Sequence, residues 1–192
     1  YLSIEQKNPW FIHLSYLRPH PPFIAPEPYD NMYQLQDVPT AVKAVTAEIE
    51  GQQHPWRMGY VNNQTQQLWY GHDASTSVKL DGAEVDQIRA TYYGLVSEVD
   101  HQIGRLINFL KENDLYDKTL IVFTTDHGEQ LGDHWLFGKS GYFDQSFHIP
   151  LIIRDPECDA IAGQVIEDFT ESIDRSEEHT SELQSRRNLV CR

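Results

Sequence analysis

The longest regular hydrophobic pattern in the chain lies between Glu84 and Leu110, where apolar side chains recur every three or four residues. They are Val85, Ile88, Tyr92, Leu95, Val99, Ile103, Leu106 and Leu110. This spacing places them on one face of an α-helix, and a one-sided apolar stripe suits packing against a sheet. We predict a helix here that begins near Asp81 or Gly82 and ends within residues 113–117.

Three short runs of apolar and β-branched residues predict strands. They are WFIHLSYL (Trp10–Leu17), the run from Thr119 that stops at Asp126, and the run Ile149–Ile153. An unbroken apolar run such as the first is typical of a strand that is covered on both faces. Because helix and strand patterns alternate, we predict the α/β class with a parallel sheet.

The segment from Pro26 to Gln67 is rich in Pro, Gln and Asn. It holds one short helical candidate, in which Val38, Val42, Val45 and Ile49 recur at spacings of four, three and four. The remainder is predicted to be loop. A long irregular excursion of this kind usually carries binding function or covers a site.

The composition limits the classes of partner. A formal net charge of -14 argues against nucleic acid and anionic membranes, which require clustered Lys and Arg. No apolar run approaches the about 18 residues of a membrane span. Cys158 and Cys191 form neither a disulfide framework nor a zinc-site spacing, so nothing marks an oxidising compartment and a cytoplasmic location is favoured.

Both ends of the sequence suggest a fragment. It starts with Tyr1 rather than Met, and strand-like sequence begins by Trp10. From Arg175 onward the sequence has neither helical nor strand periodicity. Its first part, RSEEHTSELQS (Arg175 to Ser185), resembles translated sequencing-adapter read-through. We expect residues 1–174 to be part of one domain and residues 175–192 to be an artefactual, disordered tail.

The most informative motif is Asp126-His127-Gly128, at the carboxyl end of a predicted strand. A carboxylate and an imidazole together suit manganese, iron or zinc better than calcium, although calcium and magnesium remain open. Gly128 permits the sharp turn that brings two adjacent ligands together. In the alternative interpretation, Asp126 caps a following helix and His127 hydrogen-bonds to its neighbours.

Two nearby motifs carry further charged or polar side chains that could serve an anionic substrate. Gly138-Lys139-Ser140 is not a P-loop, because five residues rather than four separate Gly132 from Gly138. Lys139 nevertheless provides positive charge. An anionic substrate would need such a charge in addition to that of a metal ion. His134 suits either support of a site or structural hydrogen bonding, and His20 follows the first predicted strand in a proline-rich turn.

The order of these motifs resembles the sulfatase family of the alkaline phosphatase superfamily, and the phosphonate monoester hydrolases within it most closely. The resemblance runs through RPHPPF, ATYYGLVSEVDHQIGRL, TTDHGEQLGDH, FGKSGY and IPLIIRDP. It implies an α/β/α sandwich with a mixed, mostly parallel sheet. It also implies that Asp126 and His127 bind one divalent metal ion and that His20 and Lys139 act on the substrate.

The implied reaction is hydrolysis of a small anionic ester by a formylglycine nucleophile made from cysteine. The sequence lacks the Cys-x-Pro-x-Arg motif from which formylglycine forms, and Cys158 has neither the Pro nor the Arg. We therefore expect the nucleophile and a further acidic metal ligand to lie upstream of residue 1, in a catalytic domain of which this is the C-terminal portion. The 192-residue chain alone is predicted to be inactive.

Three functions remain open. The leading hypothesis is a metal-dependent hydrolase of phosphonate monoesters, phosphodiesters or sulfate esters, and the alternative within the same class is an arylsulfatase. A catalytically inactive α/β domain that binds metal or a partner is the hypothesis from another class. Assembly into a homo-oligomer is compatible with each of them.

Overall fold

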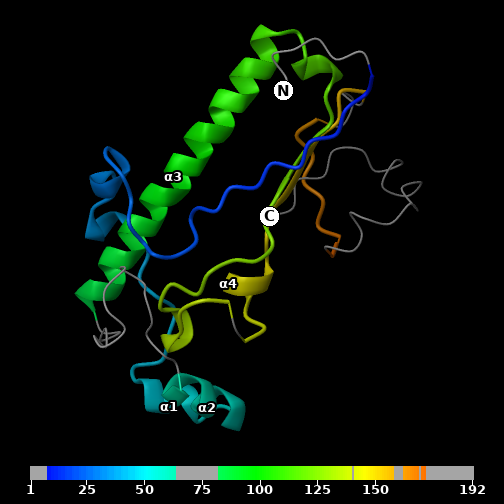
Figure 1. Cartoon of the computed structure of the whole chain (residues 1–192). Helices are drawn as coiled ribbons and strands as arrows, with labels where there is room; N and C mark the ends of the chain where they lie inside the picture. The colour runs from blue at the N-terminus through cyan, green and yellow to red at the C-terminus, as the bar shows by residue number, and fades with distance from the viewer. Residues whose placement is uncertain (1–7, 64–81, 140, 158–161, 169, 172–192) are drawn as a thin grey trace.

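The computed structural model describes residues 8–63, 82–139, 141–157, 162–168 and 170–171. Its α-helices are α1 (Ala47–Gly51), α2 (Pro55–Asn63), α3 (Ala83–Glu112) and α4 (Asp144–Phe147). Its strands are β1 (Ile121–Thr124) and β2 (Leu151–Arg154). Short 3-10 helices are η1 (Tyr29–Asn31), η2 (Leu35–Asp37), η3 (Tyr116–Lys118) and η4 (Asp133–Trp135). Figure 1 shows α1 and α2 grouped at one end of the molecule, away from the strands.

The predicted long helix is confirmed as α3, which begins directly after Gly82 and ends before Asn113. Acidic Glu84 lies in the first turn and basic Lys111 in the last, so both complement the helix dipole. The buried side of α3 includes Val85, Ile88, Leu95 and Leu110, which belong to the predicted apolar stripe. The hydrophobic spacing therefore identified both the helix and its packed face.

The hydrophobic core joins α3 to two segments that are far from it in the sequence. Val85, Ile88 and Leu95 pack with Phe23 from the N-terminal segment and with Leu131 and Phe137 from the loop that follows β1. The ring of Phe23 also meets that of Tyr92 edge-on, with centroids 5.8 Å apart. This core fixes the loop after β1, which carries the candidate site, against a rigid helix.

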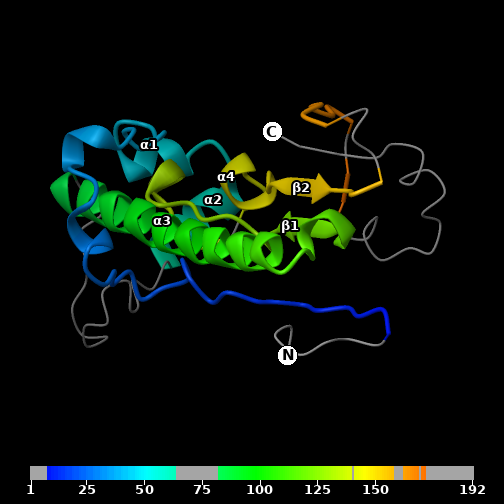
Figure 2. The ribbon, with the colours of Figure 1, turned by 90° about the horizontal axis from the view of Figure 1, so that it is seen from above.

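The two described strands form an antiparallel pair, with Val122 opposite Ile153 and Thr124 opposite Leu151. Figure 2 shows β1 and β2 side by side. The expectation of parallel neighbours is thus wrong for this pair. The segment between the strands contains η4 and α4 and returns the chain in the opposite direction, without a helical crossover covering the sheet. An antiparallel pair of this kind is what makes a sheet mixed.

The predicted strand at Trp10–Leu17 is not formed. Residues 9–17 have no regular structure, and Phe11 and Leu17 are 89% and 82% exposed. A strand requires a hydrogen-bonded neighbour, and among the described residues no strand pairs with this segment. Apolar character alone therefore overestimated both its burial and its regularity.

The helix predicted across Val38–Ile49 is also largely wrong, because only residues from Ala47 onward are helical. The preceding backbone instead bonds to η4: the Val42 N–H donates to Asp133 Oδ1 at 2.9 Å, and its carbonyl accepts from the His134 N–H at 2.9 Å. These long-range bonds outweigh a weak local helical pattern. Helix α2, within the segment predicted to be loop, was missed.

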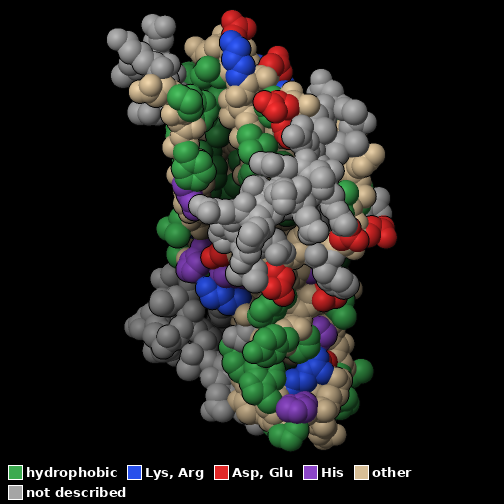
Figure 3. Space-filling view, turned by 90° about the vertical axis from the view of Figure 1, so that its right-hand side faces the viewer, with side chains coloured by type: hydrophobic (Ala, Val, Ile, Leu, Met, Phe, Trp, Pro, Cys, Tyr) green, Lys and Arg blue, Asp and Glu red, His purple; other side chains and the backbone are tan. Residues whose placement is uncertain are grey.

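Some of the predicted segments lie outside the residues that the structure describes. Residues 64–67, the end of the irregular excursion, and the whole predicted tail, residues 175–192, lie outside the described ranges. Within those ranges, no helix has the length and apolar character needed to cross a bilayer. Figure 3 shows hydrophobic side chains, drawn in green, exposed in several places on one face of the molecule.

Candidate active site

The Asp126-His127-Gly128 turn begins two residues after β1 ends. The Gly128 N–H donates to the Ser146 carbonyl of α4 at 2.8 Å. A Cβ on Gly128 would lie 2.0 Å from the Gln145 carbonyl oxygen, a distance that a real side chain cannot occupy. Glycine is therefore required for the close approach of this turn to α4, and α4 fixes where the two candidate ligands lie.

His127 presents a defined nitrogen. Its Nδ1 lies 2.7 Å from the Gly128 carbonyl oxygen, which can only accept, so Nδ1 carries the proton and donates it. Its Nε2 lies 2.8 Å from Lys139 Nζ, an ammonium that can only donate, so Nε2 carries the lone pair. A backbone carbonyl that fixes the tautomer in this way is typical of a metal-binding histidine.

Asp126 lies beside that nitrogen. Its Oδ2 is 3.6 Å from His127 Nε2, its side chain is 84% exposed, and its Oδ1 accepts from the His127 N–H at 3.0 Å. Although desolvation acts to raise it, the pKa of the Asp126 carboxyl is held below its usual value by His127 and by backbone N–H donors. The carboxyl is thus an accessible anionic oxygen next to a nitrogen lone pair.

Lys139 follows the turn at Gly138, whose φ of 82° lies in the left-handed region that favours glycine.

Glu129, half-buried beside the ligand pair, accepts from the Gly138 N–H at 2.5 Å and from the Leu131 N–H at 3.4 Å. Burial raises the pKa of the Glu129 carboxyl, against the opposing effect of these donors. Glu129 was not predicted as a site residue, although it directly follows the DHG motif.

The structure brings Asp126, His127 and Lys139 together, but it does not join His20 to them. His20 is exposed, and the hydrogen bonds shown for it within the described ranges are local: its Nδ1 lies 2.8 Å from the Pro21 carbonyl oxygen, and its N–H donates to Leu17. The proposed role of His20 thus depends on its place in the sequence motif.

The donor set suits part of a metal site. Asp126 and His127 supply one oxygen and one nitrogen donor, the mixture that manganese, iron and zinc accept. Within the part of the chain that the structure describes, no group of three His, Cys, Asp or Glu side chains is placed to hold a metal ion. Asp126 and His127 could therefore supply two donors to a metal ion.

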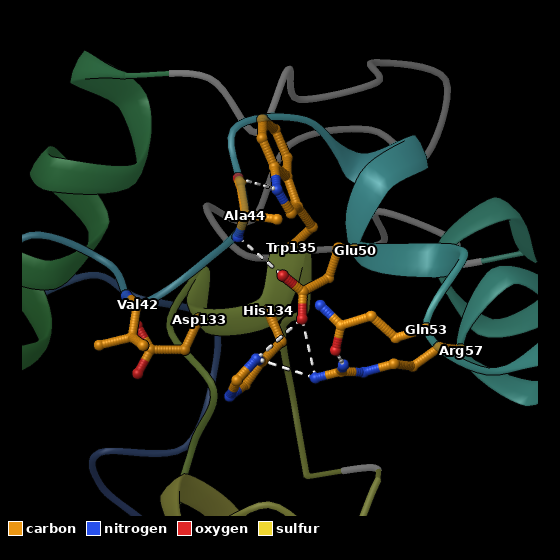
Figure 4. Close-up of polar contacts among 8 residues, drawn as sticks. All are labelled: Val42, Ala44, Glu50, Gln53, Arg57, Asp133, His134 and Trp135. Carbon is orange, nitrogen blue, oxygen red and sulfur yellow. Dashed lines mark hydrogen bonds and ion pairs between the residues drawn. The ribbon is translucent and has the colours of Figure 1, made fainter.

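A buried polar network that the sequence did not predict supports the far end of the same loop (Figure 4). Glu50, 3% exposed, pairs with Arg57 at 2.8 Å, lies 3.0 Å from His134 Nδ1, and accepts from the Ala44 N–H at 2.7 Å. The His134 ring stacks on Phe143, with centroids 4.1 Å apart. His134 is thus a structural residue, which was one of the two roles considered for it.

A second buried ion pair ties this loop to α3. Arg89 donates to Asp133 Oδ1 at 3.0 Å and to the Leu131 carbonyl at 2.9 Å. The contacts that join distant segments have no local sequence signal, because Arg89 and Asp133 are 44 residues apart and Glu50 and His134 are 84 residues apart. Together the two networks hold Leu131 and η4 in place, within a loop that has little regular structure.

We expect Gly128→Ala to disrupt the site while leaving α3 intact. The added Cβ would clash with the Gln145 carbonyl and separate the turn from α4, which moves both candidate ligands. Metal content of the purified complete gene product should fall at least about tenfold, as measured by elemental analysis. Gly104→Ala, where a Cβ meets nothing within 4 Å, is the matched control. Equal metal content in both variants would contradict the proposed geometry.

Comparisons with known proteins agree with the motif order. The sequence model of the sulfatase family, described as "Sulfatase", matches residues 1–176. The multifunctional alkaline phosphatase superfamily protein PehA of Trinickia caryophylli is 45% identical over 174 residues, which are 91% of this chain and 34% of that protein. An arylsulfatase of Clostridium perfringens is 28% identical over 157 residues, covering 79% of this chain and 29% of that protein.

The fold has a solved counterpart. The crystal structure of the phosphonate monoester hydrolase of Agrobacterium radiobacter superposes with a TM-score of 0.86 at 41% identity, over 97% of this chain and 36% of that one. This likeness confirms the alkaline phosphatase-like α/β/α class, of which the described strands form a small part. The chain spans about a third of the length of these relatives. By its sequence and its fold, the chain belongs to the sulfatase family of the alkaline phosphatase superfamily.

Proposed function

We propose that the complete protein containing this chain is a metal-dependent hydrolase of phosphonate monoesters, phosphodiesters or sulfate esters. The observation that carries the proposal is the position of His127 Nε2, 3.6 Å from Asp126 Oδ2 and 2.8 Å from Lys139 Nζ. A metal-type donor pair next to a cation suits an anionic ester. The similarity to PehA and to a phosphonate monoester hydrolase supports this substrate class.

In this proposal Asp126 and His127 hold one divalent ion, with manganese, iron or zinc favoured. A bound metal would supply Lewis-acid polarisation of an ester oxygen, and a formylglycine from a cysteine outside these 192 residues would supply the nucleophile. The Gly128 carbonyl keeps His127 in the tautomer that binds through Nε2. The α4 contact of Gly128 preorganises the pair.

Lys139 and His20 would act on the substrate itself. The ammonium of Lys139 lies 2.8 Å from a candidate ligand atom, so it is in reach of oxygens bound at the same place, where it would balance charge developing in the transition state. His20 would protonate the departing oxygen. Because its Nδ1 donates to Pro21, Nε2 is the nitrogen suited to that proton transfer.

A substrate panel with a lysine variant tests this function. The complete gene product should hydrolyse one or more of an aryl phosphonate monoester, an aryl phosphodiester and an aryl sulfate. Lys139→Ala should retain its metal but lower kcat by about 10²- to 10³-fold, the usual effect of removing one transition-state donor. Lys118→Ala, an exposed lysine in η3, is the matched control and should keep the wild-type rate. Wild-type turnover in the Lys139 variant would contradict the role.

Assays of the complete gene product also discriminate between two alternative functions. Faster turnover of sulfate esters than of phosphonate esters would favour an arylsulfatase, the class named for the Clostridium perfringens relative. The inactive binding domain is the alternative from another class, and the motif Cys-x-Pro-x-Arg in the complete reading frame discriminates it from the enzyme. A complete reading frame without that motif, and a product without turnover, would decide for the inactive binding domain.

A further inference from the structure

Glu129 connects the candidate ligand pair to the turn that carries the candidate catalytic lysine. It follows His127 by two residues, and its Oε1 accepts from the Gly138 N–H at 2.5 Å. The contact spans nine positions of the chain and ends one residue before Lys139. No other side chain among the described hydrogen bonds reaches the Gly138 N–H.

The peptide groups of Gly138 are held from both sides. The Gly138 N–H donates a hydrogen bond to the Glu129 carboxyl group, and the Gly138 carbonyl accepts one from the backbone N–H of Gln130 at 2.9 Å. Gln130 is fully buried, and its Nε2 donates to Ser146 Oγ at 2.8 Å. The backbone next to Lys139 is therefore tied to the same α4 segment that fixes Gly128.

A lysine depends on such an anchor more than a shorter side chain does. Its four-carbon stem has many rotamers, so the position of its ammonium is defined only if the backbone is fixed. Displacement of a catalytic group by about 1 Å costs on the order of 10²-fold in rate. In this structure the anchored lysine reaches His127 Nε2 at 2.8 Å while its side chain remains exposed.

We propose that Glu129 is a positioning residue, which acts by holding the Gly138 peptide so that the Lys139 ammonium faces the ligand pair. The inference rests on the proposed function, since it requires Lys139 to act on the substrate. It does not depend on the ionisation of Glu129, because Oε1 accepts a hydrogen bond in both forms. Glu129 touches neither the substrate nor a metal in this proposal.

A double-mutant cycle in the complete gene product tests the inference. Wild type, Glu129→Ala, Lys139→Ala and the double variant are compared for kcat, KM and metal content. We expect Glu129→Ala to lower kcat by about 10- to 100-fold with unchanged metal content and little change in KM. In the Lys139→Ala background the same change should cost less than about twofold, because the group that Glu129 positions is gone.

Two further variants separate positioning from structure. Glu129→Gln keeps an oxygen that can accept from the Gly138 N–H, so its kcat should stay within about threefold of wild type. Glu112→Ala, at an exposed position near the end of α3, is the matched control. If Glu129→Ala does not fold, Glu129→Asp replaces it in the cycle, because its carboxylate is one methylene shorter.

The possible results separate the positioning role of Glu129 from the proposed hydrolase function on which it rests. Equal losses on removing Glu129 with and without Lys139 would overturn the positioning role while leaving the function standing. Loss of metal from Glu129→Ala would also overturn it, since Glu129 would then act on the ligand turn. Wild-type turnover in Lys139→Ala would instead refute the proposed role of the lysine.

Discussion

Asp126→Ala should abolish both metal retention and hydrolysis in the complete gene product. The substitution removes the exposed carboxylate that lies 3.6 Å from His127 Nε2 and leaves one donor on this turn. Loss of Lewis-acid stabilisation worth several kcal/mol predicts a fall in kcat/KM of roughly 10³-fold or more. Elemental analysis and steady-state assays on the same preparation provide the measurement.

An exposed aspartate elsewhere makes the test specific. Asp100→Ala, on the solvent side of α3, removes the same charge and should leave metal content and rate unchanged. Asp126→Asn adds a second comparison, because it keeps the size of the side chain but weakens an anionic ligand. If Asp126→Ala retained stoichiometric metal, the assignment of this turn as a metal site would be wrong.

Glu50→Ala should produce the largest loss of stability among these variants. Glu50 is 3% exposed, and its removal leaves the Arg57 guanidinium and the Ala44 N–H without their shared acceptor. Breaking a buried ion pair from one side typically costs 3–5 kcal/mol, so we expect a loss of about 3 kcal/mol in the free energy of unfolding. Urea unfolding at neutral pH would measure it, with Glu112→Ala as a control that stays within about 0.5 kcal/mol.

The same residue predicts a dependence on pH. Burial acts to raise the pKa of the Glu50 carboxyl, but its bonds from Ala44 and His134 and the charge of Arg57 hold it below the usual value of 4.5. The stabilisation is therefore present above pH 4.5 and is lost as the pH falls through the lower folded-state pKa. The stability gap between wild type and Glu50→Gln should narrow in that acidic range. A gap that widened on acidification would contradict the assignment.

Local patterns predicted those parts of the fold whose causes are local. The three-four spacing of Val85, Ile88 and Leu95 identified α3, because a helix is stabilised by an amphipathic face that the sequence displays directly. The runs at β1 and β2 identified strands but not their direction, since pairing depends on the path between them. Exposed Phe11 shows that an apolar run becomes a strand only where a neighbour binds its backbone.

The candidate site was predicted to a similar extent. The DHG turn follows β1 as predicted, and the structure brings Lys139 Nζ to 2.8 Å from His127 Nε2, while the roles of these residues remain predictions. Glu50 and His134 were not foreseen as partners because 84 residues separate them. A contact of this kind has no periodicity or motif, so only the folded chain shows it.

The antiparallel pair of β1 and β2 has a practical consequence for work on the isolated chain. Within the described residues the sheet consists of these two strands, and no third strand covers the outer edge of either. Val122, Phe123 and Ile152 on this pair are also well exposed. Free edges that carry apolar side chains are templates for intermolecular strand addition and aggregation. We therefore expect the isolated chain to associate through this pair of strands as its concentration rises.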